Sequence, residues 1–124
     1  MLDLSSKEFS LTVYDSLSGL EHTLLYRQPT TAEYIETCNQ ISREENKEES
    51  ANILIEAADK LITGFEKGSI SVDGIEISSN PDDDNYYETW KKLIKENAER
   101  LLIELGTHVF IRTRSYVKKK NTTK

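Results

Sequence analysis

One short segment decides the layout of this chain: Tyr26-Arg27-Gln28-Pro29-Thr30-Thr31-Ala32-Glu33-Tyr34-Ile35. Pro29 has no N–H to donate to a strand ladder, so a strand has to end before it. Thr30 and Glu33 match the capping box, in which a hydroxyl and a carboxylate accept from each other's backbone N–H groups. The segment therefore predicts the end of a strand and the start of a helix that runs over 31–43.

The residues before this segment alternate between apolar and polar side chains. The sequence of 8–14 is Glu8-Phe9-Ser10-Leu11-Thr12-Val13-Tyr14, which has the period of a half-buried strand. Turn-forming residues follow at 15–19, and a second extended run covers 20–27. The pattern predicts an N-terminal β-hairpin that leads directly into the first helix.

Two more helices are predicted farther along the chain. Asn46, with Glu49 three residues later, indicates a second helix start, and helical apolar spacing continues it to a stop at 64–68. Asn85 and Glu88 indicate a third start, and the apolar spacing extends to Gly106. Residues 108–111 fit either a short strand or a continuation of that helix.

A second short hairpin is predicted between helices two and three. Residues 69–78 alternate around Asp73-Gly74, a dipeptide that favours tight hairpin turns. The fold class is therefore α+β, with an N-terminal β-hairpin, three main helices and this second hairpin. We expect one domain over 1–111 and a basic, flexible C-terminal tail over 112–124.

Composition and charge favour a cytoplasmic protein whose main body does not bind nucleic acid. The 124 residues contain one cysteine, no apolar run long enough for a membrane span, and no basic-then-apolar start typical of a secretory signal. The tail holds six basic and no acidic residues, whereas 1–111 holds ten basic and 22 acidic ones, a net charge of −12. Such an acidic body repels nucleic-acid phosphates.

No catalytic, cofactor-binding or metal-binding residue is nominated. The loop Asn80-Pro81-Asp82-Asp83-Asp84-Asn85 departs from the calcium-binding EF-hand loop, because Asn85 stands where glycine is needed and Lys91 where glutamate is. His22 and His108 have no ligand spacing, and Cys38 lies on a helical apolar stripe among glutamates. We therefore expect no enzyme activity, no cofactor and no metal.

The segment Leu25-Tyr26-Arg27-x-Pro29-Thr30-x-x-Glu33-Tyr34-Ile35 resembles bacteriophage and prophage tail assembly chaperones, which are small tail proteins. The segments 61–68, 72–74 and 87–90 are compatible with such proteins. The resemblance implies a non-catalytic factor that binds the tape-measure protein, a long helical and apolar chain, in the host cytoplasm.

A partner helix would need an apolar groove. The candidate groove residues are Ile53, Ala57, Leu61, Leu101 and Leu105, which fit the protein's own core equally well. Two other functions stay open on the sequence. One is a small dimeric adaptor or structural protein, and the other is a nucleic-acid-associated regulator that uses the basic tail.

Overall fold

The computed structural model describes residues 8–112, and these form an α+β fold with a three-stranded antiparallel sheet in the order β1-β2-β3. The elements in chain order are β1 (Phe9–Asp15), β2 (Leu20–Tyr26), α1 (Thr31–Arg43), α2 (Lys47–Leu61), β3 (Ile62–Phe65), β4 (Ser71–Val72), β5 (Ile75–Glu76), α3 (Trp90–Asn97), α4 (Glu99–Gly106) and the π-helical turn η1 (Thr107–Arg112). The α+β class, the N-terminal hairpin and the short β4-β5 hairpin between α2 and α3 are as predicted from the sequence. The predicted tail lies outside the described residues, apart from its first residue.

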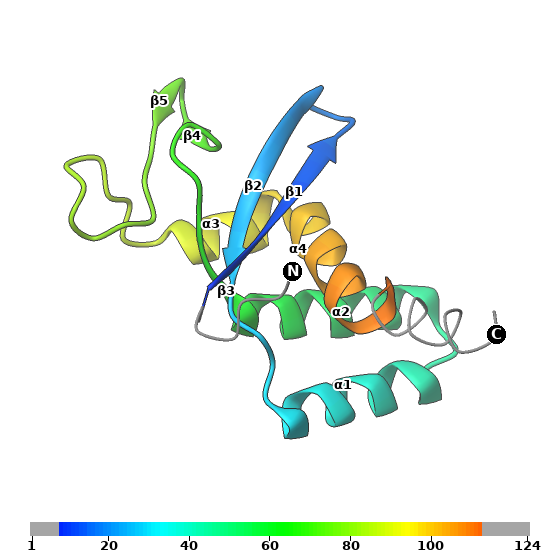
Figure 1. The fold of residues 1–124 in the computed structure, drawn as a ribbon. Coiled ribbons are helices and arrows are strands. Elements are labelled where there is room, and N and C mark those ends of the chain that lie inside the picture. Colours follow the sequence, from blue (N-terminus) through cyan, green and yellow to red (C-terminus); the bar gives the residue numbers. More distant parts are fainter. Residues whose placement is uncertain (1–7, 113–124) are drawn as a thin grey trace, which may run out of the picture.

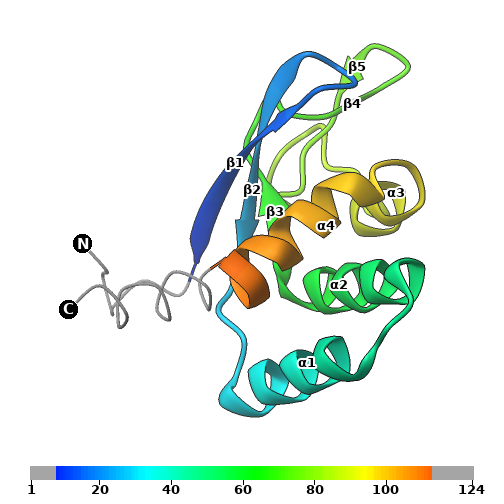
Figure 2. The same cartoon turned by 90° about the vertical axis from the view of Figure 1, so that its right-hand side faces the viewer.

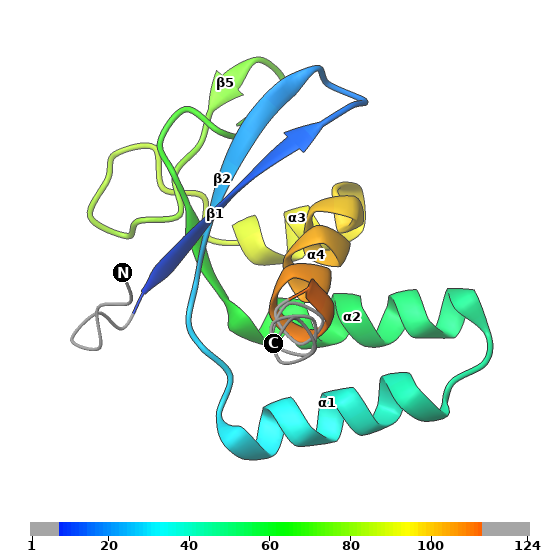
Figure 3. The ribbon, with the colours of Figure 1, turned by 45° about the vertical axis from the view of Figure 1, so that its right-hand side comes forward.

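The helices lie on one side of the sheet, and their order in space differs from their order in the chain. Helix α4 packs against both α2 and β1, while α1 lies beyond α2 on the side away from the hairpin tips (Figures 1 and 3). At the opposite end of the molecule lie the tips of the β1-β2 and β4-β5 hairpins (Figure 2). The molecule thus has a helical end and a hairpin end.

The strand-to-helix junction is as the sequence predicts. The Thr30 hydroxyl accepts from the Glu33 N–H at 3.1 Å, and the Glu33 carboxylate accepts from the Thr30 N–H at 2.8 Å. Arg27 adds a contact that the sequence did not predict, because its guanidinium donates to both oxygens of Glu33 at 2.8 and 3.0 Å. One carboxylate therefore caps α1 and ties it to the end of β2.

The prediction that the second helix stops at 64–68 is wrong. Helix α2 ends at Leu61, and β3 follows without a loop. Tertiary contacts explain the change, because Leu24 pairs with Phe65, Leu25 pairs with Gly64, and the Arg27 N–H donates to the Leu61 carbonyl at 3.0 Å. Residues 62–65 form a short, mostly buried run. Periodicity alone does not show whether such a run is a helix or a strand.

The third predicted helix starts later than expected and is divided. Asn85 does not cap it, because its side-chain amide donates to the Glu76 carbonyl at 3.2 Å, and α3 starts at Trp90. Ala98, with φ −140° and ψ 42°, separates α3 from α4. Residues 108–111 continue the helical path as part of η1, which selects one of the two predicted alternatives.

Gly106 allows α4 to pack closely on α2. A Cβ atom at this position would lie 2.9 Å from the Leu54 carbonyl oxygen, closer than real Cβ atoms approach. Leu102 and Leu105 of α4 are fully buried in the same core, together with Ala58 of α2 and Leu24 of β2. The glycine thus permits a close approach of the two helix backbones at Leu54, beside the buried core.

The two edges of the sheet differ. At the β3 edge, the Phe65 N–H donates to the Ser79 hydroxyl oxygen at 3.0 Å, and that hydroxyl donates to the Phe65 carbonyl at 3.3 Å. A Cβ atom at Gly64 would lie 2.7 Å from the same hydroxyl. Ser79 therefore covers this edge with a side chain, and β1 forms the other edge of the sheet.

Candidate functional site

A groove of about 360 Å³ separates α1 from α2 and ends at Phe110 of η1. We call it the α1-α2 groove. Its lining residues are Glu33, Glu36, Thr37, Gln40, Glu49, Asn52, Ile53, Glu56, Ala57, Lys60, Leu61 and Phe110. Ile53, Ala57 and Leu61 are spaced four residues apart, which places them on one face of α2. The groove thus has an apolar floor between two walls of polar and charged side chains.

Helix α1 is held in place by contacts of one of its sides with Phe110 of η1, and the α1-α2 groove lies open beside these contacts. Tyr34 stacks on Phe110 with ring centroids 5.8 Å apart, and the Cys38 sulfur lies 4.0 Å from the Phe110 carbonyl oxygen. Thr37 is the only α1 residue that is buried, whereas Ile35 is 52% exposed. The spacing of Ile35, Cys38 and Ile41, with Tyr34 nearby, predicts an apolar stripe on α1, and Tyr34, Cys38 and Ile41 pack against the core whereas Ile35 does not.

Glutamates dominate the charge of the groove. Four carboxylates, Glu33, Glu36, Glu49 and Glu56, line it together with a single ammonium group, that of Lys60. The Arg27 guanidinium lowers the pKa of Glu33 from 4.5 to about 2. Glu56 pairs with Lys95 at 2.7 Å and raises the pKa of that lysine. Within residues 8–112, Glu36 and Glu49 form no ion pair.

A second groove, of about 590 Å³, lies at the hairpin end. We call it the hairpin-tip groove. It is lined by Ser18, Leu20, His22, Gly68, Ser69, Ile70, Ser71, Val72, Gly74, Glu76, Leu93, Ile94, Asn97, Ala98, Arg100 and Leu101. Large apolar side chains are exposed at the hairpin tips themselves, with Leu17 at 78%, Leu20 at 61% and Ile75 at 70%. Exposed apolar side chains around a groove are typical of interaction surfaces.

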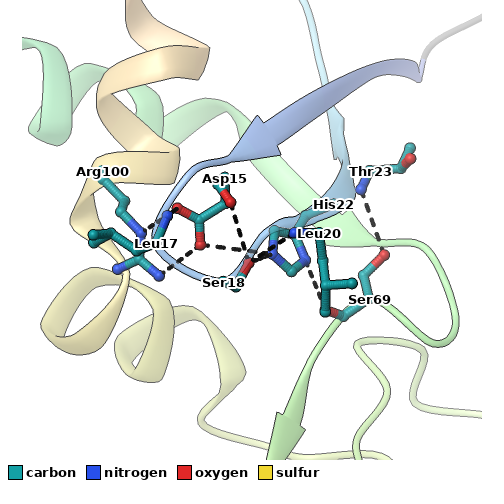
Figure 4. A network of polar contacts seen from close by, with 8 residues as sticks. All are labelled: Asp15, Leu17, Ser18, Leu20, His22, Thr23, Ser69 and Arg100. Carbon is teal, nitrogen blue, oxygen red and sulfur yellow. Dashed lines mark hydrogen bonds and ion pairs between the residues drawn. The ribbon is translucent and has the colours of Figure 1, made fainter.

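A polar network forms one wall of the hairpin-tip groove (Figure 4). Arg100 donates to both oxygens of Asp15 at 2.8 Å, and the Leu17 N–H donates to the same carboxylate at 3.2 Å. Although the Asp15 side chain is only 3% exposed, the hydrogen bonds from Arg100 hold its pKa well below the usual range. The network therefore fixes the β1-β2 turn against α4.

His22 joins this network to the loop before β4. Its Nδ1 lies 2.9 Å from the Ser69 carbonyl oxygen, and its Nε2 lies 3.1 Å from the Ser18 hydroxyl (Figure 4). Because a carbonyl only accepts, Nδ1 carries the proton and a neutral ring accepts from Ser18 at Nε2. Hydrolases use such a hydroxyl-imidazole pair with a carboxylate on the other ring nitrogen. Here the arrangement differs, because Nδ1 faces the Ser69 carbonyl rather than a carboxylate. The Asp15 carboxylate lies on the other side of the ring, 3.8 Å from Nε2, and is bound by Arg100.

The residues considered for metal chemistry lie apart and have structural contacts. Asp83 accepts from the Ser78 hydroxyl at 2.6 Å and pairs with Lys67 at 3.5 Å, which lowers the pKa of Asp83. His108 packs edge-on against Tyr26, and Cys38 is half-buried. Within residues 8–112, no three His, Cys, Asp or Glu side chains are placed to hold a metal ion.

The five candidate groove residues fall into three places. Ile53 and Ala57 are partly exposed and line the α1-α2 groove, Leu61 and Leu101 border the α1-α2 and hairpin-tip grooves but are only 1% and 4% exposed, and Leu105 is fully buried in the core. Sequence reasoning missed the exposed apolar side chains Leu17, Leu20 and Ile75. The available signal was their position beside turns, where polar residues are the rule.

No helix in the described part of the chain is long and apolar enough to cross a membrane. No protein family matches the sequence, and comparisons with curated proteins and with solved structures give no significant match.

Proposed function

We propose that this protein is a non-catalytic tail assembly factor of a phage or prophage that binds a helical tail protein, such as the tape-measure protein, in the α1-α2 groove. One observation carries the proposal: Ile53 and Ala57, nominated from the sequence as groove residues, are partly exposed and line the same open groove, which the buried Leu61 also borders. The resemblance of 25–35 to tail assembly chaperones supplies the biological setting. Its strand-Pro-Thr-helix junction is the element that positions α1, one wall of the groove.

The dimensions of the groove suit side chains better than a whole helix. An α-helix is about 10 Å across, whereas about 360 Å³ accommodates only a few large side chains. A partner helix would lie along the mouth and insert apolar residues at i, i+3 or i+4, and i+7. Covering this stripe keeps an apolar helix from aggregating, and the acidic surface keeps the complex in solution.

The first test is the gene neighbourhood. We expect the gene to lie between genes for a tail tube protein and a very long helical protein. The second test is co-expression with that long protein, which should remain soluble and co-purify with this chain. Isolated expression of the long protein, without this chain, provides the baseline for its solubility.

A matched pair of variants locates the binding site. Ile53→Ser removes apolar surface from the groove floor, whereas Ile75→Ser makes the same change at an exposed hairpin tip outside the groove. We expect Ile53→Ser to reduce co-purification while Ile75→Ser leaves it unchanged, with circular dichroism confirming that both variants fold. A gene neighbourhood without tail genes, together with no binding to a helical partner, would reject the proposal.

A second candidate function is a small adaptor that associates through the hairpin-tip groove. The exposed Leu17, Leu20 and Ile75 favour it, because these apolar side chains lie at the hairpin tips and Leu20 also lines that groove, which has no residue of α1 or α2 in its lining. In that case Ile75→Ser, rather than Ile53→Ser, would abolish association. Light scattering over a range of protein concentrations distinguishes self-association from binding to another protein.

A further inference from the structure

The mouth of the α1-α2 groove carries negative charge on both helices. Glu36 belongs to α1 and Glu49 to α2, and neither forms an ion pair within residues 8–112. The other two glutamates of the groove already have partners, Arg27 and Lys95. The two unpaired carboxylates are therefore free to bind cations that approach the mouth from outside.

The charge of the surrounding protein acts in the same direction. Residues 8–111 hold nine basic and 21 acidic side chains, a net charge of −12. Such a surface attracts a positively charged partner and repels a negatively charged one, and it raises the association rate most at low ionic strength. Apolar contact with Ile53 and Ala57 can favour any amphipathic helix, so the charges are what discriminate among helices of similar apolar pattern.

We infer that the occupant of the α1-α2 groove is a basic amphipathic helix of a partner protein, in which lysines or arginines flank the apolar stripe and face Glu36 and Glu49. This inference rests on the proposed function and adds the chemistry of the partner to it. The apolar stripe covers the partly exposed Ile53 and Ala57 on the groove floor, and the cations stay at the solvent-exposed mouth. Each exposed ion pair of this kind changes affinity by a factor of about 1.4 to 5.

The test uses the full chain and two synthetic helical peptides with the same leucine spacing. One peptide has lysines beside the leucines, and the other has glutamates at those positions. Fluorescence anisotropy gives Kd for each peptide at low salt and in 0.5 M salt. We expect the basic peptide to bind at least tenfold more tightly at low salt, and salt to reduce the difference.

Matched variants assign the effect to the groove. Glu36→Gln with Glu49→Gln should weaken binding of the basic peptide by roughly 2- to 30-fold, the factor that corresponds to two exposed ion pairs. Asp82→Asn with Glu88→Gln changes the net charge equally in an exposed loop region outside the groove, and should have a much smaller effect. Equal weakening by both double variants would overturn the inference, because only overall charge would then matter.

The remaining outcomes separate the inference from the proposed function. If both peptides bind equally through Ile53, the charge assignment is wrong and helix binding stands. If neither peptide binds, and the long tail protein does not bind either, both proposals fail.

If the triple variant Lys118→Gln, Lys119→Gln, Lys120→Gln binds the basic peptide tenfold more tightly, the chain's own basic residues occupy the groove. A dimer that dissociates on Glu36→Gln with Glu49→Gln would assign the groove to a second copy, and either result would overturn the partner assignment.

Discussion

Asp15 at the end of β1 and Arg100 in α4 form a bidentate ion pair, with both donor-acceptor distances at 2.8 Å. The two residues are 85 positions apart in the sequence. Their contact joins the N-terminal hairpin to the C-terminal helices, which also pack through the apolar core. It also sets the position of the β1-β2 turn, and hence one wall of the hairpin-tip groove.

Removal of Arg100 should destabilise the protein more than removal of both partners. Arg100→Gln leaves the Asp15 carboxylate, which is 3% exposed, without its main donor. In the double variant with Asp15→Asn, no unpaired charge is left, so its loss should be smaller than the sum of the two single losses. Urea denaturation of the three variants measures this coupling, and additive losses would show that the pair does not act as a unit.

Stability should fall as the pH decreases below about 5, through carboxylates whose pKa is lowered in the folded state. The pKa of Glu33 is lowered from 4.5 to about 2, mainly by Arg27. The unfolded chain therefore binds more protons in this range. The contribution of Glu33 is present in full above pH 4.5 and is lost as the pH falls through 2.

Glu33→Gln tests this pH dependence. The variant should be less stable than the wild type at pH 7, and the difference should shrink toward pH 2. Arg27→Gln removes the main cause of the lowered pKa and should show the same trend. Thermal or urea unfolding at a series of pH values provides the measurement, and a difference that stays constant with pH would contradict the assignment.

Thr30→Ala should destabilise the protein by about 1 kcal/mol, because it removes the side-chain cap of α1. Thr30→Ser keeps a hydroxyl at the same position and should restore most of the loss. Helix α1 forms one wall of the α1-α2 groove, so the alanine variant should also weaken binding of a helical partner. Urea denaturation and peptide titration together check both effects. Unchanged stability in Thr30→Ala would mean that the Arg27–Glu33 contact alone fixes the start of α1.

Gly106→Ala should destabilise the protein by about 1–3 kcal/mol, the usual range for overpacking a core. The added methyl group would lie 2.9 Å from the Leu54 carbonyl oxygen, so α4 and α2 would have to move apart. Glu99→Gln, at an exposed position in the same helix, should change stability by less than about 0.5 kcal/mol. If Gly106→Ala proved stabilising through its helix propensity, the close approach of the two helices would be wrong.

Local sequence signals predicted the elements whose determinants are local. Thr30, Glu33 and Asn46 cap helices through neighbours three residues away or closer. Asp73 and Gly74 have φ of 52° and 79°, as their tight turn requires. These contacts lie within one turn of a helix or one hairpin, and so residue spacing is sufficient to identify them.

The errors arose where distant partners decide the structure. Residues 62–65 form a strand because β2 pairs with them, and Asn85 bonds to Glu76 across a loop rather than capping a helix. Of the candidate groove residues, Leu101 and Leu105 have the same periodic pattern as Ile53, yet both belong to the buried core whereas Ile53 is partly exposed. The period shows which residues share a helix face, but the packing of the other helices decides whether that face is covered.

The contact between Ser79 and Phe65 also makes the two edges of the sheet unequal as places where a further strand could pair. A strand from another molecule meets a side-chain hydroxyl, bonded to the Phe65 N–H and carbonyl, at the β3 edge. At the β1 edge, the described residues place no further strand. Head-to-tail polymerisation by edge-to-edge pairing needs two open edges, so the Ser79 contact disfavours growth of this sheet from molecule to molecule through the backbone groups of Phe65.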